Sequence, residues 1–215
     1  VFTIGPVFNQ PIGNWDTGNA TQMRAMFLGC TAFDQDISKW NTSKVTEMFD
    51  MFKDAANFNQ DISTKIVNEG EPDEYVAWDV SNVTVMTSMF WGAKKFNQPI
   101  GNWDVSKDTS MGGGTSGSNG MFRDCTAFDQ DLSAWDVSKV TNMEQMFRNA
   151  SSFDQDLSSW AVTNVTTYGN FLVGASSFSA ENYSKLLVAW SQLPLYKDLP
   201  FGATPKYTLE GAGGR

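Results

Sequence analysis

The stretch FDQDLSSWAVTNV at residues 153–165, with the MFRNASS that precedes it, decides the fold because the chain repeats it. The repeated motif is Phe-Asp/Asn-Gln-Asp/Pro-Ile/Leu-Ser/Gly-x-Trp, and its copies begin at Phe8, Phe33, Phe58, Phe96, Phe128 and Phe153, with a degenerate seventh at Phe178. The copies start 25, 25, 38, 32, 25 and 25 residues apart, so the period is 25 with additions of 13 and 7. A fixed period of about 20–50 residues predicts an array of similar turns stacked on one another.

Each copy has two halves that differ in the spacing of their apolar residues. The first half, for example FDQDISKW at 33–40, predicts an extended segment with a bend. The second half, for example VTEMFDMF at 45–52, has apolar residues at i, i+3, i+6 and i+7, which is one face of a short helix. In VTNMEQMF at 140–147, Thr141 and Glu144 also have the spacing of a capping box. The pattern therefore predicts one short strand and one short helix in each turn.

Methionine and tryptophan occupy fixed places in the repeat. All ten methionines fall at the two Met positions of the second half, and six of the eight tryptophans fall in one column. A methionine stripe can bind soft metals, but at helical spacing beside a Phe it favours core packing. A tryptophan column that faces inward would be core, and one that faces outward would be a platform for sugars. The predicted structural core includes Trp40, Met48, Met51, Phe52, Trp135, Met143, Met146, Phe147 and Trp160.

Two polar columns accompany the apolar ones. The first is Gln in every copy, and side-chain amides at one position can form a hydrogen-bonded ladder from turn to turn. The ladder residues include Gln35, Gln60, Gln98, Gln130 and Gln155. The second column holds Pro11, Asp36, Asp61, Pro99, Asp131 and Asp156. Carboxylates in register could bind calcium, but the two prolines and the lack of a binding-loop motif favour a role in turns or caps.

Two insertions interrupt the repeat, and they are the candidate binding loops. KIVNEGEPDEYVA at 65–77 is acidic, and GGGTSGSNG at 112–120 is rich in glycine. Insertions in a repeat array often map to loops that bind a partner, yet surface insertions cost little entropy and can also be neutral. The candidate binding residues are Glu69, Glu71, Asp73, Glu74, Tyr75, Thr115 and Ser118.

The two ends of the array are expected to be covered, because the open end of a stack exposes apolar surface. Phe2 and Ile4 are candidate lid residues over the first turn. After Phe178, the segment ENYSKLLVAWSQL at 181–193 has helical spacing and ends before Pro194. We therefore expect a repeat array over 1–178 and a C-terminal cap over 179–215.

The formal net charge of −9 disfavours nucleic acid and anionic membranes as partners. No run of about 18 apolar residues is present, so no membrane insertion is expected, and the first residues do not resemble a signal peptide. Cys30 and Cys125 lie three copies apart in a column of small residues. That separation is too large for a disulfide, so two free thiols are expected.

The signature FNQDIS-W-DVSNVT-M-MF resembles the repeats of the BspA-type leucine-rich-repeat surface proteins, a family known from mycoplasmas, other bacteria and some protists and viruses. The resemblance covers about residues 8–178, and SAENYSKLLVAWSQL resembles the helix that closes such arrays. It implies an α/β fold, namely a right-handed leucine-rich-repeat-like solenoid of about six 25-residue turns with a C-terminal helical cap. It also implies a secreted or cell-surface protein with a role in adhesion.

Motifs for catalysis and for cofactors are missing from the sequence. It contains no histidine, and GGGTSGSNG lacks the Lys of a phosphate-binding loop. We expect no enzyme activity, no cofactor and no metal; a carbohydrate-active enzyme that uses the acids at 69–74 is a weaker hypothesis. The leading hypothesis is a non-catalytic extracellular surface module that binds a protein or glycan on a cell surface. The alternative is a structural subunit that binds copies of itself in a fibre or on a virion surface.

Overall fold

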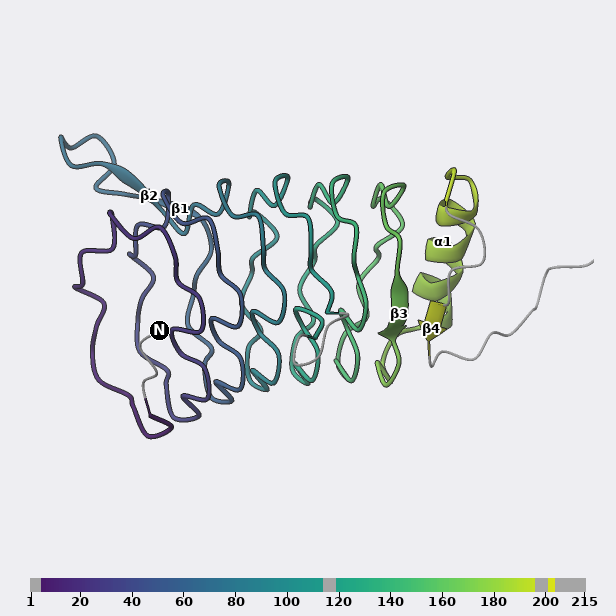
Figure 1. The fold of residues 1–215 in the computed structure, drawn as a ribbon, viewed down its shortest axis with the longest axis horizontal. Helices are drawn as coiled ribbons and strands as arrows, with labels where there is room; N and C mark the ends of the chain where they lie inside the picture. The colour runs from purple at the N-terminus through teal and green to yellow at the C-terminus, as the bar shows by residue number, and fades with distance from the viewer. Residues whose placement is uncertain (1–4, 114–118, 196–200, 204–215) are drawn as a thin grey trace, which may run out of the picture.

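The computed structural model describes residues 5–113 and 119–195, and the backbone of 201–203. In Figure 1 the chain winds through successive turns that lie side by side along the long axis of the molecule, with a helix at the C-terminal end. The elements are β1 (Lys65–Val67), β2 (Tyr75–Ala77), β3 (Tyr168–Leu172), α1 (Ala180–Ser191) and β4 (Phe201–Ala203). Strand β1 pairs antiparallel with β2, and β3 pairs parallel with β4.

The short helix predicted in each turn does not form in the described residues. Among the described residues α1 is the only α-helix, and both 45–52 and 140–147 form turns. In four of the five Met-containing segments the residue just before the second Met has a left-handed backbone: φ is 53° at Ala25, 56° at Asp50, 58° at Ser88 and 60° at Gln145. This conformation interrupts an α-helix and costs a non-glycine residue about 1–2 kcal/mol.

Main-chain groups of this segment bond to the next turn instead of within a helix. Every second N–H donates to a carbonyl of the following turn: Met23 to Glu47 at 3.0 Å, Ala25 to Phe49 at 2.8 Å and Phe27 to Met51 at 2.8 Å. Single β-bridges such as Gln22↔Glu47 therefore form in the second half of the copies, whereas the extended segment predicted at 33–40 forms no strand. The spacing of i and i+3 thus marks a tight turn, as in the bond from the Met51 N–H to the Met48 carbonyl at 3.1 Å.

The predicted capping box is also wrong. The Thr141 hydroxyl donates to the Thr109 carbonyl of the preceding turn at 3.0 Å, and the Glu144 N–H donates to Asn142 Oδ1 at 2.8 Å. The threonines equivalent to Thr141 in the repeat therefore hydrogen-bond to the preceding turn and do not begin a helix, as Thr166 does to the Thr141 carbonyl at 3.0 Å.

Aromatic rings stack in columns that run along the array. The Phe52 and Phe90 ring centroids are 5.6 Å apart with planes 4° from parallel, and the Trp103 and Trp135 centroids are 6.5 Å apart. Each pair of this kind adds about 0.5–1.5 kcal/mol to the stabilisation from burial. Each buried tryptophan of the column also donates its Nε1–H to the preceding turn, as Trp103 does to the Ile62 carbonyl at 2.9 Å.

The residues that the sequence indicated as core lie inside these columns. Each has an exposed fraction of 3% or less: Trp40, Met48, Met51, Phe52, Trp135, Met143, Met146, Phe147 and Trp160. Met26 is the one methionine that is only partly buried. Trp15 is the exception in the tryptophan column, because it is 50% exposed. Cys30 and Cys125 are buried and form no disulfide.

The glutamine column bonds from turn to turn, but not from one glutamine to the next. Gln60 Nε2 donates to Asp34 Oδ1 at 2.8 Å, and the same oxygen accepts the Asn59 N–H at 2.9 Å. The other ladder residues have equivalent bonds: Gln35 to Asn9, Gln98 to Asn59, Gln130 to Asn97 and Gln155 to Asp129. The acceptor is thus an Asp or Asn of the preceding turn, one column away from the one that we predicted.

The aspartate column closes turns. Each Oδ1 accepts the N–H of the serine two residues later, at 2.8–2.9 Å, in Asp36, Asp61, Asp131 and Asp156. Where Pro replaces Asp, Gly replaces that serine, and a Cβ on Gly13 would lie 2.5 Å from the Asp36 carbonyl oxygen. Within the described ranges, no group of three or more His, Cys, Asp or Glu side chains could hold a metal ion.

The C-terminal helix was predicted over 181–193 and forms over Ala180–Ser191, so this prediction is confirmed. The hydroxyl of Ser179 caps it by accepting the Asn182 N–H at 3.2 Å. Its buried side chains are those of Tyr183, Leu186 and Trp190. No helix in the described ranges has the length and apolarity needed to cross a membrane.

Candidate binding site

The first insertion forms a hairpin that projects from the body of the array (Figure 1). Strands β1 and β2 pair in the register Lys65↔Ala77, Ile66↔Val76 and Val67↔Tyr75. Positive φ values of 57° at Asn68 and 81° at Gly70 turn the chain between them. Asn68 Nδ2 donates to Asp73 Oδ2, and the Gly70 N–H donates to Glu74 Oε2, both at 2.7 Å.

Two contacts hold the hairpin against the second turn of the array. The Tyr75 hydroxyl donates to the Lys39 carbonyl at 2.6 Å, and Ala77 forms an antiparallel bridge with Asn41. Burial, and after it the charge of Asp73, raises the pKa of Tyr75. The phenol therefore stays protonated at neutral pH and keeps its role as a donor.

The outer side of the hairpin combines apolar and acidic groups. Ile66 and Val76 lie opposite one another in the register and are 52% and 40% exposed. The four acidic side chains are also exposed: Glu69, Glu71, Asp73 and Glu74. An exposed cross-strand apolar pair beside several carboxylates is a surface that can bind a partner with apolar and basic groups.

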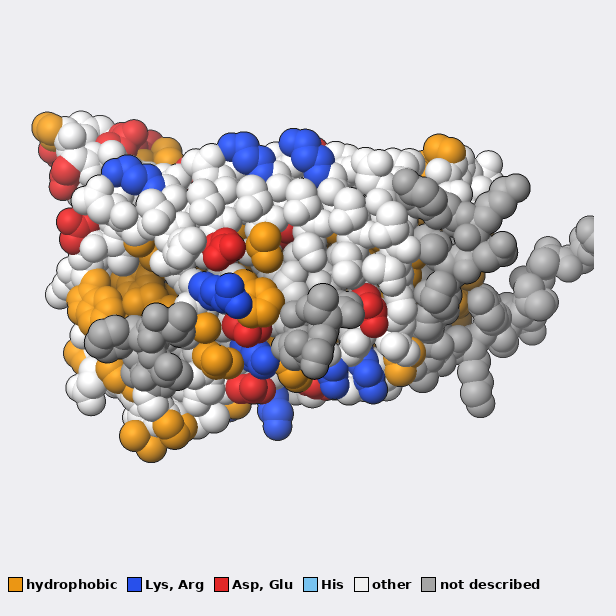
Figure 2. All heavy atoms as spheres, viewed as in Figure 1, with side chains coloured by type: hydrophobic (Ala, Val, Ile, Leu, Met, Phe, Trp, Pro, Cys, Tyr) orange, Lys and Arg blue, Asp and Glu red, His pale blue; other side chains and the backbone are white. Residues whose placement is uncertain are grey.

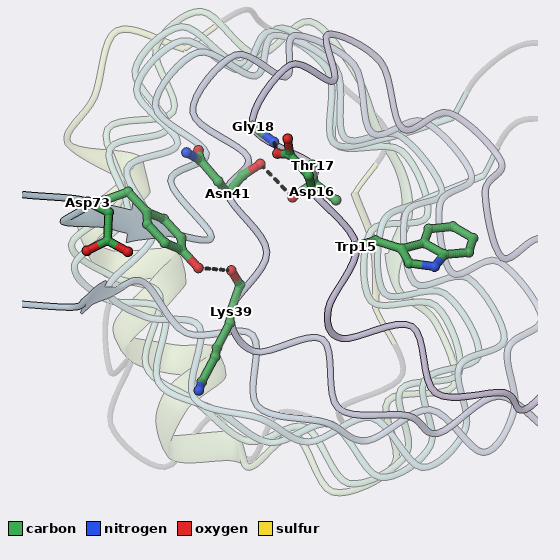
Figure 3. A pocket seen from close by; sticks show the side chains of 8 residues that line it. Trp15, Asp16, Thr17, Gly18, Lys39, Asn41 and Asp73 are labelled. Carbon is green, nitrogen blue, oxygen red and sulfur yellow. Dashed lines mark hydrogen bonds between the residues drawn. The ribbon is translucent and has the colours of Figure 1, made fainter.

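A pocket of about 480 Å³ lies between the hairpin and the first two turns (Figure 3). Its lining is Trp15, Asp16, Thr17 and Gly18 from the first turn, Lys39 and Asn41 from the second, and Asp73 and Tyr75 from the hairpin. The two turns are joined at its wall by the Thr17 hydroxyl, which donates to the Asn41 carbonyl at 3.0 Å. The pocket has the size of a small-ligand site, and its groups can hydrogen-bond and stack.

The candidate binding residues named from the sequence separate in the structure. Asp73 and Tyr75 line the pocket, Glu74 accepts a bond from the hairpin's own Gly70, and Glu69 and Glu71 are exposed at the hairpin turn. Thr115 and Ser118 lie outside the described residues, as do the lid candidates Phe2 and Ile4.

The second insertion leaves the array at a different place. Its described end, Asn119, is buried, and the Asn119 N–H bonds to Ser88 Oγ at 2.8 Å while Asn119 Oδ1 accepts from the Arg123 guanidinium. The hairpin instead contacts Lys39 and Asn41. The described parts of the two insertions therefore do not share one binding surface.

The sequence did not indicate Trp15, Asp16, Lys39 or Asn41 as site residues. Asp16, Lys39 and Asn41 are ordinary members of repeat columns, and only the return of the hairpin over the second turn makes them line a pocket. For Trp15 a signal existed: it is the first tryptophan of its column in this sequence, and it stacks on Trp40 with ring centroids 6.3 Å apart.

The array also contains a buried carboxyl group that sequence reasoning missed. Asp108 occupies the column of Val83 and Val140, and its side chain is 0% exposed. Asp108 Oδ1 accepts the Ser110 N–H at 2.8 Å, whereas Oδ2 has no hydrogen-bond partner in the described chain. Burial raises the pKa of Asp108 to about 7, against the N–H groups of Ser110, Thr109 and Met86, which favour the charged form. Comparison of DVSKDTSM with DVSKVTNM would have identified this residue.

One family model matches the chain twice, at residues 1–71 and 66–186, and its description is "Mycoplasma protein of unknown function, DUF285". The two matches overlap in the first part of the hairpin insertion. No curated protein and no solved structure matches the chain.

Proposed function

We propose that this chain, which belongs to the DUF285 family, is a non-catalytic surface module that binds another protein through hairpin β1–β2. The family description gives no function, so the proposal rests on the geometry of the site. The resemblance of the repeat to BspA-type surface proteins supports an extracellular or cell-surface location. The assignment to the right-handed leucine-rich-repeat class stays a prediction.

The observation that carries the proposal is the ordered hairpin itself. An insertion that drifted neutrally has no need of internal bonds, but Asn68 and Gly70 bond to the side chains of Asp73 and Glu74. Tyr75 further fixes the hairpin to the second turn. The hairpin is thereby held in one orientation, and its acidic and apolar groups stay exposed.

The chemistry of the hairpin favours a protein with a basic and apolar surface. Carboxylates attract Lys and Arg over a distance of about 8–10 Å at physiological ionic strength, while Ile66 and Val76 supply apolar contact. A glycan would depend on a different residue, the exposed indole of Trp15 in the adjoining pocket. The two ligand classes can therefore be separated by mutation.

The alternative hypothesis of a self-assembling subunit requires two exposed ends, because head-to-tail growth joins the last turn of one copy to the first turn of the next. Here α1 and β4 cover the last turn. This arrangement favours the binding module over the fibre.

The test presents the purified, immobilised chain to a phage-displayed peptide library and to a glycan array. We expect it to select peptides that combine Lys or Arg with apolar residues, and binding should weaken as salt is raised. In the variant E69Q/E71Q/D73N/E74Q the affinity for these peptides should fall at least about tenfold, because the variant removes the attraction to basic groups.

A matched control neutralises four exposed acids elsewhere in the array: Asp104→Asn, Asp131→Asn, Asp136→Asn and Glu181→Gln. It carries the same net charge as the hairpin variant and should bind the peptides nearly as well as the unchanged chain. Peptides that bind the hairpin variant as tightly as the unchanged chain would overturn the proposal. Glycan binding that is lost in Trp15→Ala would instead identify a glycan as the ligand.

A further inference from the structure

The base of hairpin β1–β2 is held between two turns of the array. On one side, the Trp78 N–H donates to the Trp40 carbonyl of the second turn at 3.1 Å. On the other side, the side-chain amide of Asn102 pairs with the peptide groups of Thr64. Asn102 Oδ1 accepts the Thr64 N–H at 3.2 Å, and Nδ2 donates to the Thr64 carbonyl at 2.8 Å. The amide thus makes the two hydrogen bonds that a neighbouring main chain would make beside β1.

The bonding pattern shows which peptide groups of β1 point away from β2. Ala77 forms an antiparallel bridge with Asn41, while its neighbour Trp78 donates to the second turn. The peptide groups of Ala77 itself therefore point toward β1. Because these directions alternate along a strand, the N–H and C=O of Ile66 point outward, like those of Thr64 two residues before. No hydrogen bond among the described residues uses these two groups of Ile66 outside the β1–β2 pair.

This outer edge of β1 lies on the side of the following turn, and two features that often protect such an edge lie elsewhere. Lys65 does not cover it, because Lys65 Nζ bonds to Asp61 Oδ2 in the body of the array at 2.7 Å. Pro72 is at the turn of the hairpin and not in β1. Beside the edge, the Ile66 side chain is 52% exposed. An extended segment can therefore pair with Ile66 and contact its side chain.

Two carboxylates that follow β1 are available to such a segment. Asp73 and Glu74 already accept hydrogen bonds within the hairpin. The side chains of Glu69 and Glu71 are exposed and have no hydrogen bond or ion pair to a described residue. Figure 2 shows acidic and hydrophobic side chains together on the projecting hairpin. Glu69 comes three residues after Ile66, so a Lys or Arg about three residues along an added strand can reach these carboxylates.

We propose that the partner of the hairpin is an extended basic segment of another protein, which adds to the outer edge of β1 as a further strand. This binding mode rests on the function proposed above and names the class of segment that is bound. The segment pairs with the N–H and C=O of Ile66, places an apolar side chain on Ile66, and directs a Lys or Arg to Glu69 or Glu71. Strand addition gains affinity from main-chain bonds and specificity from side chains.

In the first experiment the probe is the synthetic peptide acetyl-Lys-Thr-Val-Thr-Val-Lys-Lys-amide, which combines strand-forming and basic residues. It is titrated onto the intact chain up to about 1 mM, and amide hydrogen exchange is followed by NMR. We expect saturable protection of the Ile66 amide. The Val67 amide, which faces Tyr75 across the hairpin, should exchange equally with and without the peptide. Absence of binding, or binding that leaves exchange at Ile66 unchanged, would overturn the proposal.

Methylation of one peptide nitrogen of the probe at a time separates main-chain pairing from side-chain contact. The nitrogen that faces the Ile66 carbonyl should be sensitive, and its methylation should weaken binding about tenfold, because a hydrogen bond is lost. Methylation of the next nitrogen along the probe should have little effect, since alternate peptide groups point away from the edge. An equal response at all positions would contradict strand addition.

The variant Ile66→Pro removes the outward N–H from the chain itself. Proline is tolerated where the N–H of an edge strand points to solvent, so β1 can still pair with β2. Relative to Ile66→Ala, which also loses the side chain but keeps the N–H, Ile66→Pro should bind the probe at least about fivefold more weakly. Val76→Pro and Val76→Ala are the matched pair on the opposite edge and should bind equally. If the Val67 amide loses its protection in Ile66→Pro, the hairpin has opened and the methylated probes decide.

The carboxylates separate this binding mode from the hairpin function. E69Q/E71Q should weaken binding of the probe about tenfold and more than D73N/E74Q, which changes the net charge equally. If the probe needs Glu69 and Glu71 but tolerates methylation and Ile66→Pro, the hairpin function stands and strand addition is overturned. If no basic peptide binds the hairpin, both fall. If light scattering shows a dimer in which the Ile66 amide is protected, a second copy is the occupant and the proposal is wrong.

Discussion

The Asx residue that follows the Phe of the repeat accepts hydrogen bonds at both ends of the array, but from different donors. At the first turn Asn9 Oδ1 accepts the Asp34 N–H and Gln35 Nε2 of the next turn. At the C-terminal end, Asp154 Oδ1 accepts the Ser179 N–H at 2.8 Å and Asn182 Nδ2 at 3.0 Å, in place of the backbone and Gln donors of a next turn. At the N-terminal end, no described residue supplies the corresponding partners of Trp15 and Gln10. At the C-terminal end, α1 and the residue before it thus take the place of the donors that a further turn would supply.

The first and largest difference between the ends concerns their aromatic residues. Trp190 of α1 is 4% exposed and packs on Tyr168 and Phe171, with centroids 5.5 and 5.9 Å away. Trp190→Ala should therefore lower the free energy of unfolding by about 3–5 kcal/mol, as expected for a buried tryptophan. The measurement is urea denaturation followed by circular dichroism. Val188→Ala on the exposed side of the same helix should stay within about 0.5 kcal/mol, and an equal cost in both variants would refute a packed cap.

A second difference lies between the regular turns and the turn beside the second insertion, where Asp108 replaces a buried valine. The unfolded carboxyl has a pKa of 3.8 and the folded one a pKa of about 7. Folding therefore favours the protonated form, and its contribution is complete below pH 4 and is lost as the pH rises through about 7. The loss between these limits amounts to about 4 kcal/mol.

The variant Asp108→Asn tests this contribution, because it keeps an acceptor and cannot ionise. Its stability relative to the unchanged chain should rise from pH 4 to pH 8, as measured by urea denaturation at each pH. Asp136→Asn is the control with the opposite sign. Hydrogen bonds from Ser138 lower the pKa of Asp136, so its contribution is present at neutral pH and is lost as the pH falls. Parallel stability curves for the unchanged chain and Asp108→Asn would contradict the buried position of the carboxyl.

A smaller effect is expected at the Asx column, and it compares the ends directly. Asp154→Ala should cost about 1–3 kcal/mol, because the half-buried side chain joins the last turn to α1 through Ser179 and Asn182. Asn9→Ala removes the equivalent hydrogen bond, from the Asp34 N–H to Asn9 Oδ1, at the exposed first turn and should cost about 1 kcal/mol or less. Hydrogen exchange of the Ser179 and Asp34 amides follows the two hydrogen bonds separately. A larger loss of stability in Asn9→Ala than in Asp154→Ala would contradict the tighter packing of the last turn.

Much of this architecture could be predicted from the period of 25 residues, but not its local structure. The burial of Met48 and Trp40 followed from their columns, since a residue repeated in every copy meets its equivalents in neighbouring turns. The helix at 45–52 was predicted wrongly, because an i, i+3 spacing fits both a helix and a pair of tight turns. What decides between them is the left-handed backbone at Asp50. Asp is enriched in that conformation, but the equivalent residues Ala25 and Gln145 are not, so the column gave no consistent signal.

The candidate site was predictable only in part, and for a similar reason. The acidic insertion was visible as a departure from the period, and so Asp73 and Tyr75 could be named. Lys39 and Asn41 could not, because their role depends on the hairpin turning back over the second turn through the Tyr75 hydroxyl. Contacts between an insertion and a repeat have no period, so no comparison among copies reveals them.

The smallest effect is expected at Trp15, and it tests whether the exposed tryptophan contributes less to stability than its buried equivalents. Because the indole is 50% exposed and, among the described residues, stacks on Trp40 alone, Trp15→Ala should cost about 1 kcal/mol or less. Trp103 is 3% exposed and stacks between Trp78 and Trp135, so Trp103→Ala should cost about 3–5 kcal/mol. Urea denaturation of both variants gives the difference, and equal costs would show that Trp15 is covered in solution.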